Sequence, residues 1–188
     1  MHKTKRNIFE KSMELFAKKG YEATSIEEIT AVAGIAKGTF YYHFSSKEEI
    51  FEFLIEEGMK LLKNNIEIKT YKLENSIDKI KAIILIQIKL AIKYENFLKI
   101  IISSMWGTES RNQICRNSIN EYINIIDEIV KEGIKKNEIK NNNNEITAYS
   151  IFQTITSTML YKDNLKDKRD IEKLCNDFCN ILVNGIKK

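Results

Sequence analysis

The chain has 188 residues, of which 43% are hydrophobic and 30% charged, and its formal net charge is +4. This balance is typical of a folded globular protein and argues against disorder, and the positive charge is too small for the whole surface to bind a polyanion. With no proline and only seven glycines, the sequence offers few turn signals for a sheet-rich fold, so we expect an all-α protein.

The sequence also argues against a membrane protein. Its longest uncharged stretch, Ile146–Tyr161, is too short and too rich in Thr, Ser and Gln to span a bilayer. The basic N-terminus lacks the apolar core of a signal peptide. We therefore expect a cytoplasmic protein that makes no membrane contact.

The three cysteines, an odd number, fit a reducing compartment as plain buried thiols. Cys175 and Cys179 share one helix face, but the only two histidines, His2 and His43, lie far away in the sequence. The sequence therefore predicts neither a metal site nor a cofactor.

The first predicted helix, Lys5–Lys19, places Ile8 and Phe16 on one apolar face and ends at Gly20. Residues 1–19 hold six basic and two acidic side chains, which is a local charge of +4. Both solvated helix faces and nucleic-acid-binding surfaces are often basic. The charge alone therefore does not distinguish a solvated face from a DNA-binding surface.

A second helix is predicted to begin at Thr24 and Ser25 and to run to Ala33, where a glycine stops it. Its start offers two overlapping capping boxes, one of Thr24 with Glu27 and one of Ser25 with Glu28.

The third predicted helix, Ala36–Tyr42, follows after a three-residue turn, and two short helices joined in this way form a helix-turn-helix. At 100° per residue, Phe40 and Phe44 fall on one side and should close a small three-helix core. The other side carries Lys37, Gly38, Tyr41 and Tyr42. Tyrosine hydroxyls donate to phosphate oxygens, and a lysine reaches a guanine edge or a phosphate, so this side predicts DNA binding.

Six further helical stretches are predicted over residues 46–66, 76–93, 95–105, 112–136, 145–162 and 168–186. The fifth is uncharged for sixteen residues, and such a helix must be covered on more than one side. The last carries two neighbouring apolar stripes, one of Ile171, Leu174, Phe178 and Ile181 and one of Cys175, Cys179, Leu182 and Ile186. We expect a four-helix homodimer interface through about 145–162 and 168–186. The alternative is that both helices are central in the core of a monomer.

Five segments of the first quarter of the chain follow one known pattern: Phe16–Tyr21, Thr24–Thr30, Gly34–Ile35, Gly38–Phe44 and Lys47. With them, residues 8–54 resemble the N-terminal DNA-binding domain of the TetR family of bacterial transcriptional repressors. Only Thr30, where that family usually has Ala, departs visibly from the pattern.

The resemblance implies a helix-turn-helix DNA-binding domain over residues 1–46 and a helical ligand-binding and dimerisation domain over residues 47–188. It implies a ligand-responsive transcriptional regulator that binds a near-palindromic operator in double-stranded DNA as a homodimer. We expect a repressor that a small, apolar effector releases. The sequence leaves open the operator, the regulated genes and the choice between repression and activation.

The resemblance also assigns the DNA contacts. Thr24 and Ser25 would hold phosphates, although both also cap their helix without DNA. The major groove would receive Lys37, Gly38, Thr39 and Tyr41. The DNA backbone would be anchored by Tyr42, His43 and Lys47. For His43, packing beside Phe44 is the alternative.

An effector pocket is predicted in the later helices. Its walls would be Phe97, Ile101, Met105, Trp106, Tyr122, Phe152, Thr156 and Met159. Aromatic and methionine residues at helical spacing are also ordinary core residues, and packing is the alternative for each of them.

Two other classes of function compete with a DNA-binding regulator. An enzyme would need a nucleophile, a base or a metal set, and the sequence offers neither a His/Cys/Asp arrangement nor a glycine-rich phosphate loop, so no enzyme is predicted. A TetR-like adaptor that acts through a protein partner would have the same fold. That role gives no reason to keep Lys37, Tyr41, Tyr42 and Lys47 together.

Overall fold

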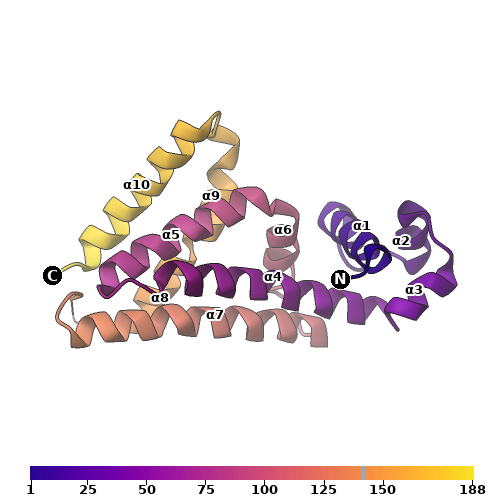
Figure 1. Ribbon diagram of the computed structural model, residues 1–188, viewed down its shortest axis with the longest axis horizontal. Helices are drawn as coiled ribbons and strands as arrows, with labels where there is room; N and C mark the ends of the chain where they lie inside the picture. Colours follow the sequence, from indigo (N-terminus) through magenta and orange to yellow (C-terminus); the bar gives the residue numbers. More distant parts are fainter. Residues whose placement is uncertain (141–142) are drawn as a thin grey trace. The chain divides into compact units, whose positions relative to one another are not determined.

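The computed structural model describes residues 1–140 and 143–188, and helices are the regular elements of these residues, apart from one β-bridge between Ile139 and Lys187 (Figure 1). The α-helices are α1 Lys3–Lys19, α2 Ile26–Ala33, α3 Lys37–His43, α4 Lys47–Thr70, α5 Ser76–Lys93, α6 Glu95–Ser103, α7 Ser110–Lys135, α8 Asn144–Phe152, α9 Thr154–Tyr161 and α10 Lys168–Ile186; a 3-10 turn, η1, follows α9 at Lys162–Asn164. The predicted all-α fold is confirmed.

Most predicted helix bounds agree with the structure to within a few residues. The prediction of one continuous helix over residues 145–162 is wrong. The structure divides it at Gln153 into α8 and α9. The hydroxyls of Thr147, Ser150 and Thr158 each donate to the carbonyl four residues earlier, at 2.6–2.9 Å. Such hydroxyl bonds compete with the helical ladder and bend helices, which explains why an uninterrupted apolar pattern does not give one straight helix.

The contacts within the chain define two compact units, which are Met1–Met59 with Asn96–Ser118, and Lys60–Glu95 with Ile119–Lys188. Helices α4 and α7 each contribute residues to both units. These units differ from the two predicted domains, residues 1–46 and 47–188, which were defined by function. The predicted domain division stays a prediction.

The first unit is built around an aromatic core. Phe40 and Phe44 are 0% and 1% exposed, and their ring centres lie 6.0 Å apart. Phe16 of α1 and Phe51 of α4 pack edge to face at 6.1 Å. The ammonium of Lys5 lies 4.8 Å from the ring centre of Phe44, so part of the basic N-terminus is used in packing. The prediction that Phe40 and Phe44 close the core is confirmed.

A close contact joins α4 and α6 within the same unit. The ring of Phe97, which is 8% exposed, lies directly on Gly58 of α4. A methyl group at Gly58 would overlap that ring, so the glycine is required by the close approach of the two helices.

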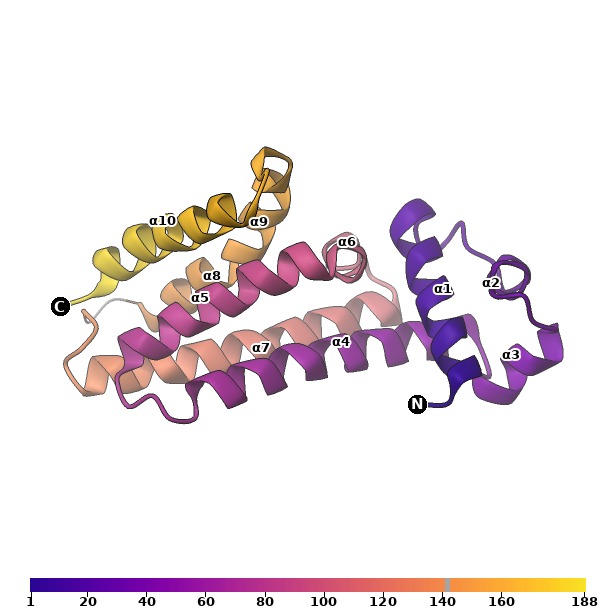
Figure 2. The same cartoon turned by 45° about the horizontal axis from the view of Figure 1, so that its top comes forward.

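The second unit is organised around α5, which packs against both α9 and α10 (Figure 2). Its apolar interior contains a chain of hydrogen bonds. The Gln87 side-chain amide donates to the hydroxyl of Tyr122 at 2.6 Å and accepts from the hydroxyl of Thr154 at 2.5 Å. All three side chains are at most 1% exposed, so these bonds satisfy polar groups that would be costly to bury alone.

We predict that Gly58→Ala destabilises the protein by roughly 1 to 3 kcal/mol, because the added methyl group overpacks the contact with Phe97. The measurement is thermal unfolding followed by circular dichroism. Gly38→Ala is the matched control, since a methyl group at Gly38 meets no atom within 4 Å. Equal melting temperatures for the two variants would contradict the prediction.

Candidate DNA-binding surface

The helix-turn-helix is held by local hydrogen bonds that the sequence dictates. The Ser25 hydroxyl accepts from the backbone N–H of Glu28 at 3.2 Å, and the Glu28 carboxylate accepts from the backbone N–H of Ser25 at 3.0 Å. This is a complete capping box at the start of α2. At its end, Gly34 takes the left-handed conformation with φ +66°, which turns the chain toward α3.

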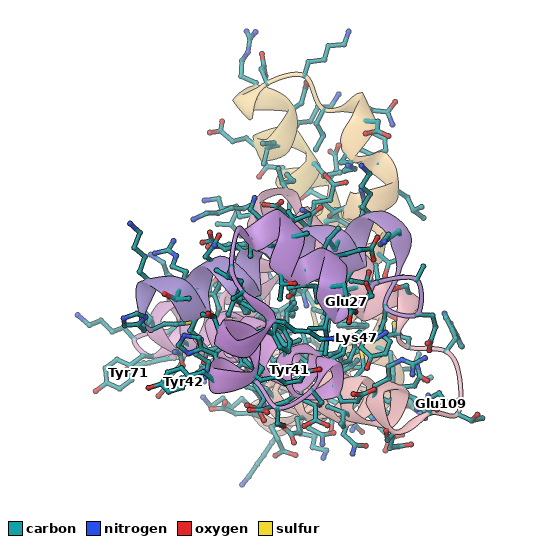
Figure 3. The ribbon with its side chains drawn as sticks, turned by 90° about the vertical axis from the view of Figure 1, so that its right-hand side faces the viewer. Glu27, Tyr41, Tyr42, Lys47, Tyr71 and Glu109 are labelled. Carbon is teal, nitrogen blue, oxygen red and sulfur yellow. The ribbon has the colours of Figure 1, made fainter. Side chains whose placement is uncertain are left out.

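The faces of α3 divide as predicted. Tyr41 is 48% exposed and Tyr42 is 84% exposed, while Phe40, the residue before them in α3, is fully buried. Lys37 and Gly38 are also exposed, and Thr39 is half-buried. Tyr41 and Tyr42 project outward from α3, as Figure 3 shows. The helix therefore presents a polar and aromatic outer face over an apolar inner face.

The lysine on this face is not free in the structure. Lys37 forms an ion pair with Glu27 of α2, and both side chains are more than half exposed. The hydrogen bond from Lys37 lowers the pKa of the Glu27 carboxyl, so Glu27 is charged at neutral pH. A phosphate that binds Lys37 has to replace this carboxylate, and the sequence reasoning missed Glu27 as a competitor.

Lys47 is engaged by the protein backbone. Its ammonium donates to the carbonyl oxygens of Tyr21 and Thr24, at 3.0 and 2.9 Å, and lies 4.2 Å from the centre of the Tyr21 ring. In Figure 3 it points in among neighbouring side chains. These contacts tie the start of α4 to the turn between α1 and α2. A contact between Lys47 and the DNA backbone stays a prediction.

Thr24 and Ser25 differ in what they can offer to DNA. Ser25 is half-buried and caps α2 as predicted. The predicted capping box of Thr24 with Glu27 is wrong, because the Thr24 hydroxyl donates to the carbonyl of Gly20 at 2.8 Å and Thr24 is 1% exposed. Its role in holding a phosphate stays a prediction, and this burial counts against it.

His43 lies at the end of α3 between two other rings. It stacks on His2 with the ring centres 6.0 Å apart, and meets the ring of Tyr42 edge to face at 5.0 Å. It is half-buried, so it packs on these two rings, and not on Phe44 as the alternative had it, and part of the imidazole stays accessible. Its contact with the DNA backbone stays a prediction.

The predicted pocket residues fall into the two units. The first unit contains Phe97, Ile101, Met105 and Trp106, and the second contains Tyr122, Phe152, Thr156 and Met159. Trp106 is 76% exposed, so it does not line an apolar cavity in this structure, contrary to the prediction. Tyr122 and Phe152 are 0% and 6% exposed, with ring centres 6.0 Å apart, which is the packing alternative.

Comparison with known proteins identifies the family. Residues 8–54 match the profile of bacterial regulatory proteins of the tetR family. The HTH-type transcriptional regulator QacR of Staphylococcus aureus is 30% identical to this chain, and the match covers 98% of each protein. The chain belongs to the TetR family.

Two solved structures are similar to nearly the full length of the chain. A provisionally assigned fatty acid metabolism regulator of Clostridium perfringens is 33% identical with a TM-score of 0.88, covering 97% of this chain and 99% of that one. The transcriptional regulator FadR of Bacillus subtilis, solved with stearoyl-CoA, is 27% identical with a TM-score of 0.82, covering 96% and 98%.

As a TetR-family member the chain is a ligand-responsive transcriptional regulator, and the predicted function of a repressor that responds to a small effector is confirmed at the level of the family. Regulators of this family bind operator DNA and small-molecule effectors. These relatives are regulators and not enzymes. No helix among the described residues is long and apolar enough to cross a bilayer.

We predict that Glu27→Gln strengthens DNA binding, because it frees Lys37 and removes a negative charge beside the predicted contacts. The slope of log Kd against log salt should steepen by about one unit, as expected for one more lysine–phosphate contact. Fluorescence anisotropy with a labelled duplex across a salt series measures both quantities.

The matched control is Glu121→Gln, which breaks an exposed lysine–glutamate pair between α4 and α7, outside the predicted DNA contacts. Affinity that rises equally in both variants would reflect net charge alone, and unchanged affinity in Glu27→Gln would show that Lys37 makes no phosphate contact.

Proposed function

We propose that this TetR-family chain represses genes of fatty acid metabolism and that a long-chain fatty acyl-CoA releases it from its operator. The observation that carries the proposal is the full-length similarity to FadR, which was solved with stearoyl-CoA. This similarity covers 96% of the chain and so extends far beyond the DNA-binding match at residues 8–54. The Clostridium perfringens relative has a provisional name of the same kind.

The second unit has the chemistry that an acyl chain would need. Its interior is lined by isoleucines of α5, among them Ile80, Ile83 and Ile84, each fully buried. Buried side chains are closely packed as a rule, so an acyl chain that enters this interior would displace some of them. Displacing these side chains would change how the helices pack. Release from DNA requires such a change, because the effector has to favour a conformation that binds DNA less tightly.

On the DNA side, the proposal is a homodimer that reads a near-palindromic operator, with two α3 helices entering successive major grooves about one helical turn, roughly 34 Å, apart. Lys37, Gly38, Thr39 and Tyr41 would lie in the major groove, where a lysine reaches a base edge or a phosphate, and the DNA backbone would meet Tyr42 and His43. A protein that acts on the bacterial chromosome would work in the cytoplasm.

The proposed dimer surface lies on α8, α9 and α10. These helices leave large apolar side chains in solvent, namely Ile146, Tyr149, Leu160, Tyr161 and Ile181, which are 46–81% exposed. Cys175 and Val183 of α10, at 7% and 3%, instead face the core of the chain. Ile181 of the first apolar stripe is thus exposed while Cys175 of the second is buried, and the exposed apolar side chains of the three helices support pairing with a second copy.

We predict that Ile181→Glu converts the dimer to a monomer, because it places a charge among the exposed apolar side chains of α8, α9 and α10. Light scattering coupled to size exclusion measures the mass. Ile68→Glu is the matched control, since Ile68 of α4 is 73% exposed and Ile181 is 71% exposed. A monomeric wild-type protein, or a dimeric Ile181→Glu variant, would overturn this interface.

We predict that stearoyl-CoA weakens binding to a duplex selected from random DNA by about 5- to 150-fold, the usual range of allosteric coupling. Fluorescence anisotropy at fixed salt measures the effect, with acetyl-CoA and free stearate as controls that supply the nucleotide or the chain alone. Release by none of the three would refute the proposed effector class while leaving DNA binding intact.

The same selection distinguishes the alternative function, a TetR-like adaptor that acts through a protein partner. An adaptor would enrich no sequence from the random DNA and would bind all duplexes with the same steep salt dependence. A regulator of the proposed kind would enrich a sequence with two related half-sites.

A further inference from the structure

A cluster of side chains on and around Tyr21 joins three segments of the first unit. It consists of Tyr21, Glu22, Lys47, Glu48 and Arg111, and we call it the Tyr21 cluster. The guanidinium of Arg111, in the first turn of α7, lies 4.6 Å from the centre of the Tyr21 ring. Arg111 also pairs with Glu22, the next residue along the turn between α1 and α2. One side chain of α7 thus holds this turn by two contacts.

The ring of Tyr21 is fixed from the other directions by the start of α4. Its hydroxyl donates to the carboxylate of Glu48 at 2.6 Å, and the ammonium of Lys47 lies 4.2 Å from the ring centre. Burial raises the pKa of this hydroxyl and the bond to Glu48 raises it further, so the hydroxyl stays protonated and keeps donating. Tyr21 is 9% exposed and packs against Phe16 and Phe51 of the core.

The stacking contact matters more than the ion pair. The side chain of Glu22 is 73% exposed, and a pair with such a solvated partner contributes little. The side chain of Arg111 is only 20% exposed, because it lies against the ring. A guanidinium that lies over an aromatic face is attracted to it, and moving the ring away would remove this contact from Arg111.

The N-terminal end of α7 is also joined to the loop that precedes it. The Asn112 side chain donates to the carbonyl of Ser104 at 3.1 Å, and Arg116 donates to the carbonyl of Gly107 at 2.8 Å. This loop contains Trp106, the single tryptophan of the chain, which is 76% exposed. A shift of the first turn of α7 therefore moves the loop and changes the surroundings of Trp106.

We propose that Arg111 is a positioning residue that couples the α6–α7 loop to the DNA-reading helices. The Tyr21 cluster contains no predicted DNA contact except Lys47, which faces the ring and backbone carbonyls. Arg111 acts on DNA binding through Tyr21, which sets the α1–α2 turn and the start of α4 in place. Because energetic coupling is reciprocal, DNA bound to α3 changes the α6–α7 loop, whatever the effector is.

The test uses acrylamide quenching of Trp106 in the full-length protein, with and without saturating duplex selected from random DNA. In the wild type, DNA changes the quenching constant of Trp106. The ratio of this constant with DNA to the constant without DNA therefore differs from one. In Arg111→Ala the ratio returns to one although the variant still binds the duplex, and the Kd rises about fivefold or more because the reading helices are less well positioned. A purely structural role would lower the melting temperature but leave the ratio unchanged.

Arg169→Ala is the matched control, since it removes an arginine from an exposed position on α10, outside the first unit. It should keep the wild-type ratio. Glu22→Gln, which keeps the stacked arginine and loses only the ion pair, should retain more than half of the change. If Arg111→Ala does not fold by circular dichroism, Arg111→Gln takes its place, because it keeps a polar side chain of similar reach.

Two results would overturn the proposal. A DNA-linked change that persists in the Arg111 variants would show that coupling takes another route. A wild-type ratio of one, with the duplex demonstrably bound by anisotropy, would show that this loop does not sense DNA. Neither result depends on the identity of the effector, so the acyl-CoA proposal stands or fails separately.

Discussion

The burial of two phenylalanines, four residues apart on one short helix, fixes the rest of the DNA-binding unit. Phe40 and Phe44 are fully enclosed, and each contributes roughly 1.5 to 3 kcal/mol by leaving water. A seven-residue helix is too short to be stable alone, so this burial holds α3 in place and sets its rotation. With that rotation fixed, Tyr41 and Tyr42 face solvent.

Four lysines of this unit have partners within the protein. Lys37 forms an ion pair with Glu27, and Lys19 forms one with Glu28. Lys47 has two backbone carbonyls and an aromatic ring, while Lys5 lies over Phe44. At Lys37, the predicted binding of DNA would therefore be an exchange of partners, in which a phosphate replaces the carboxylate of Glu27.

The sequence predicted the fold and the outer face of α3 because both follow from periodicity. Helical phase placed Phe40 inside and Tyr42 outside, and the Ser25 capping box marked the start of α2. Periodicity does not show which partners meet across helices. The pairing of Lys37 with Glu27, ten residues apart, and the stacking of Arg111 on Tyr21, ninety residues apart, depend on how the helices pack. Trp106 failed as a pocket residue for a related reason, since it follows the last turn of α6 and lies in a loop.

The continuity of two helices gives the Tyr21 cluster its significance. The first turn of α4 supplies Lys47 and Glu48, and the first turn of α7 supplies Arg111. Each helix then continues without a break into the second unit, where α5 and the apolar interior lie. Within the first unit, the first turns of both helices contact the same ring, so the position of Tyr21 depends on α4 and on α7 together.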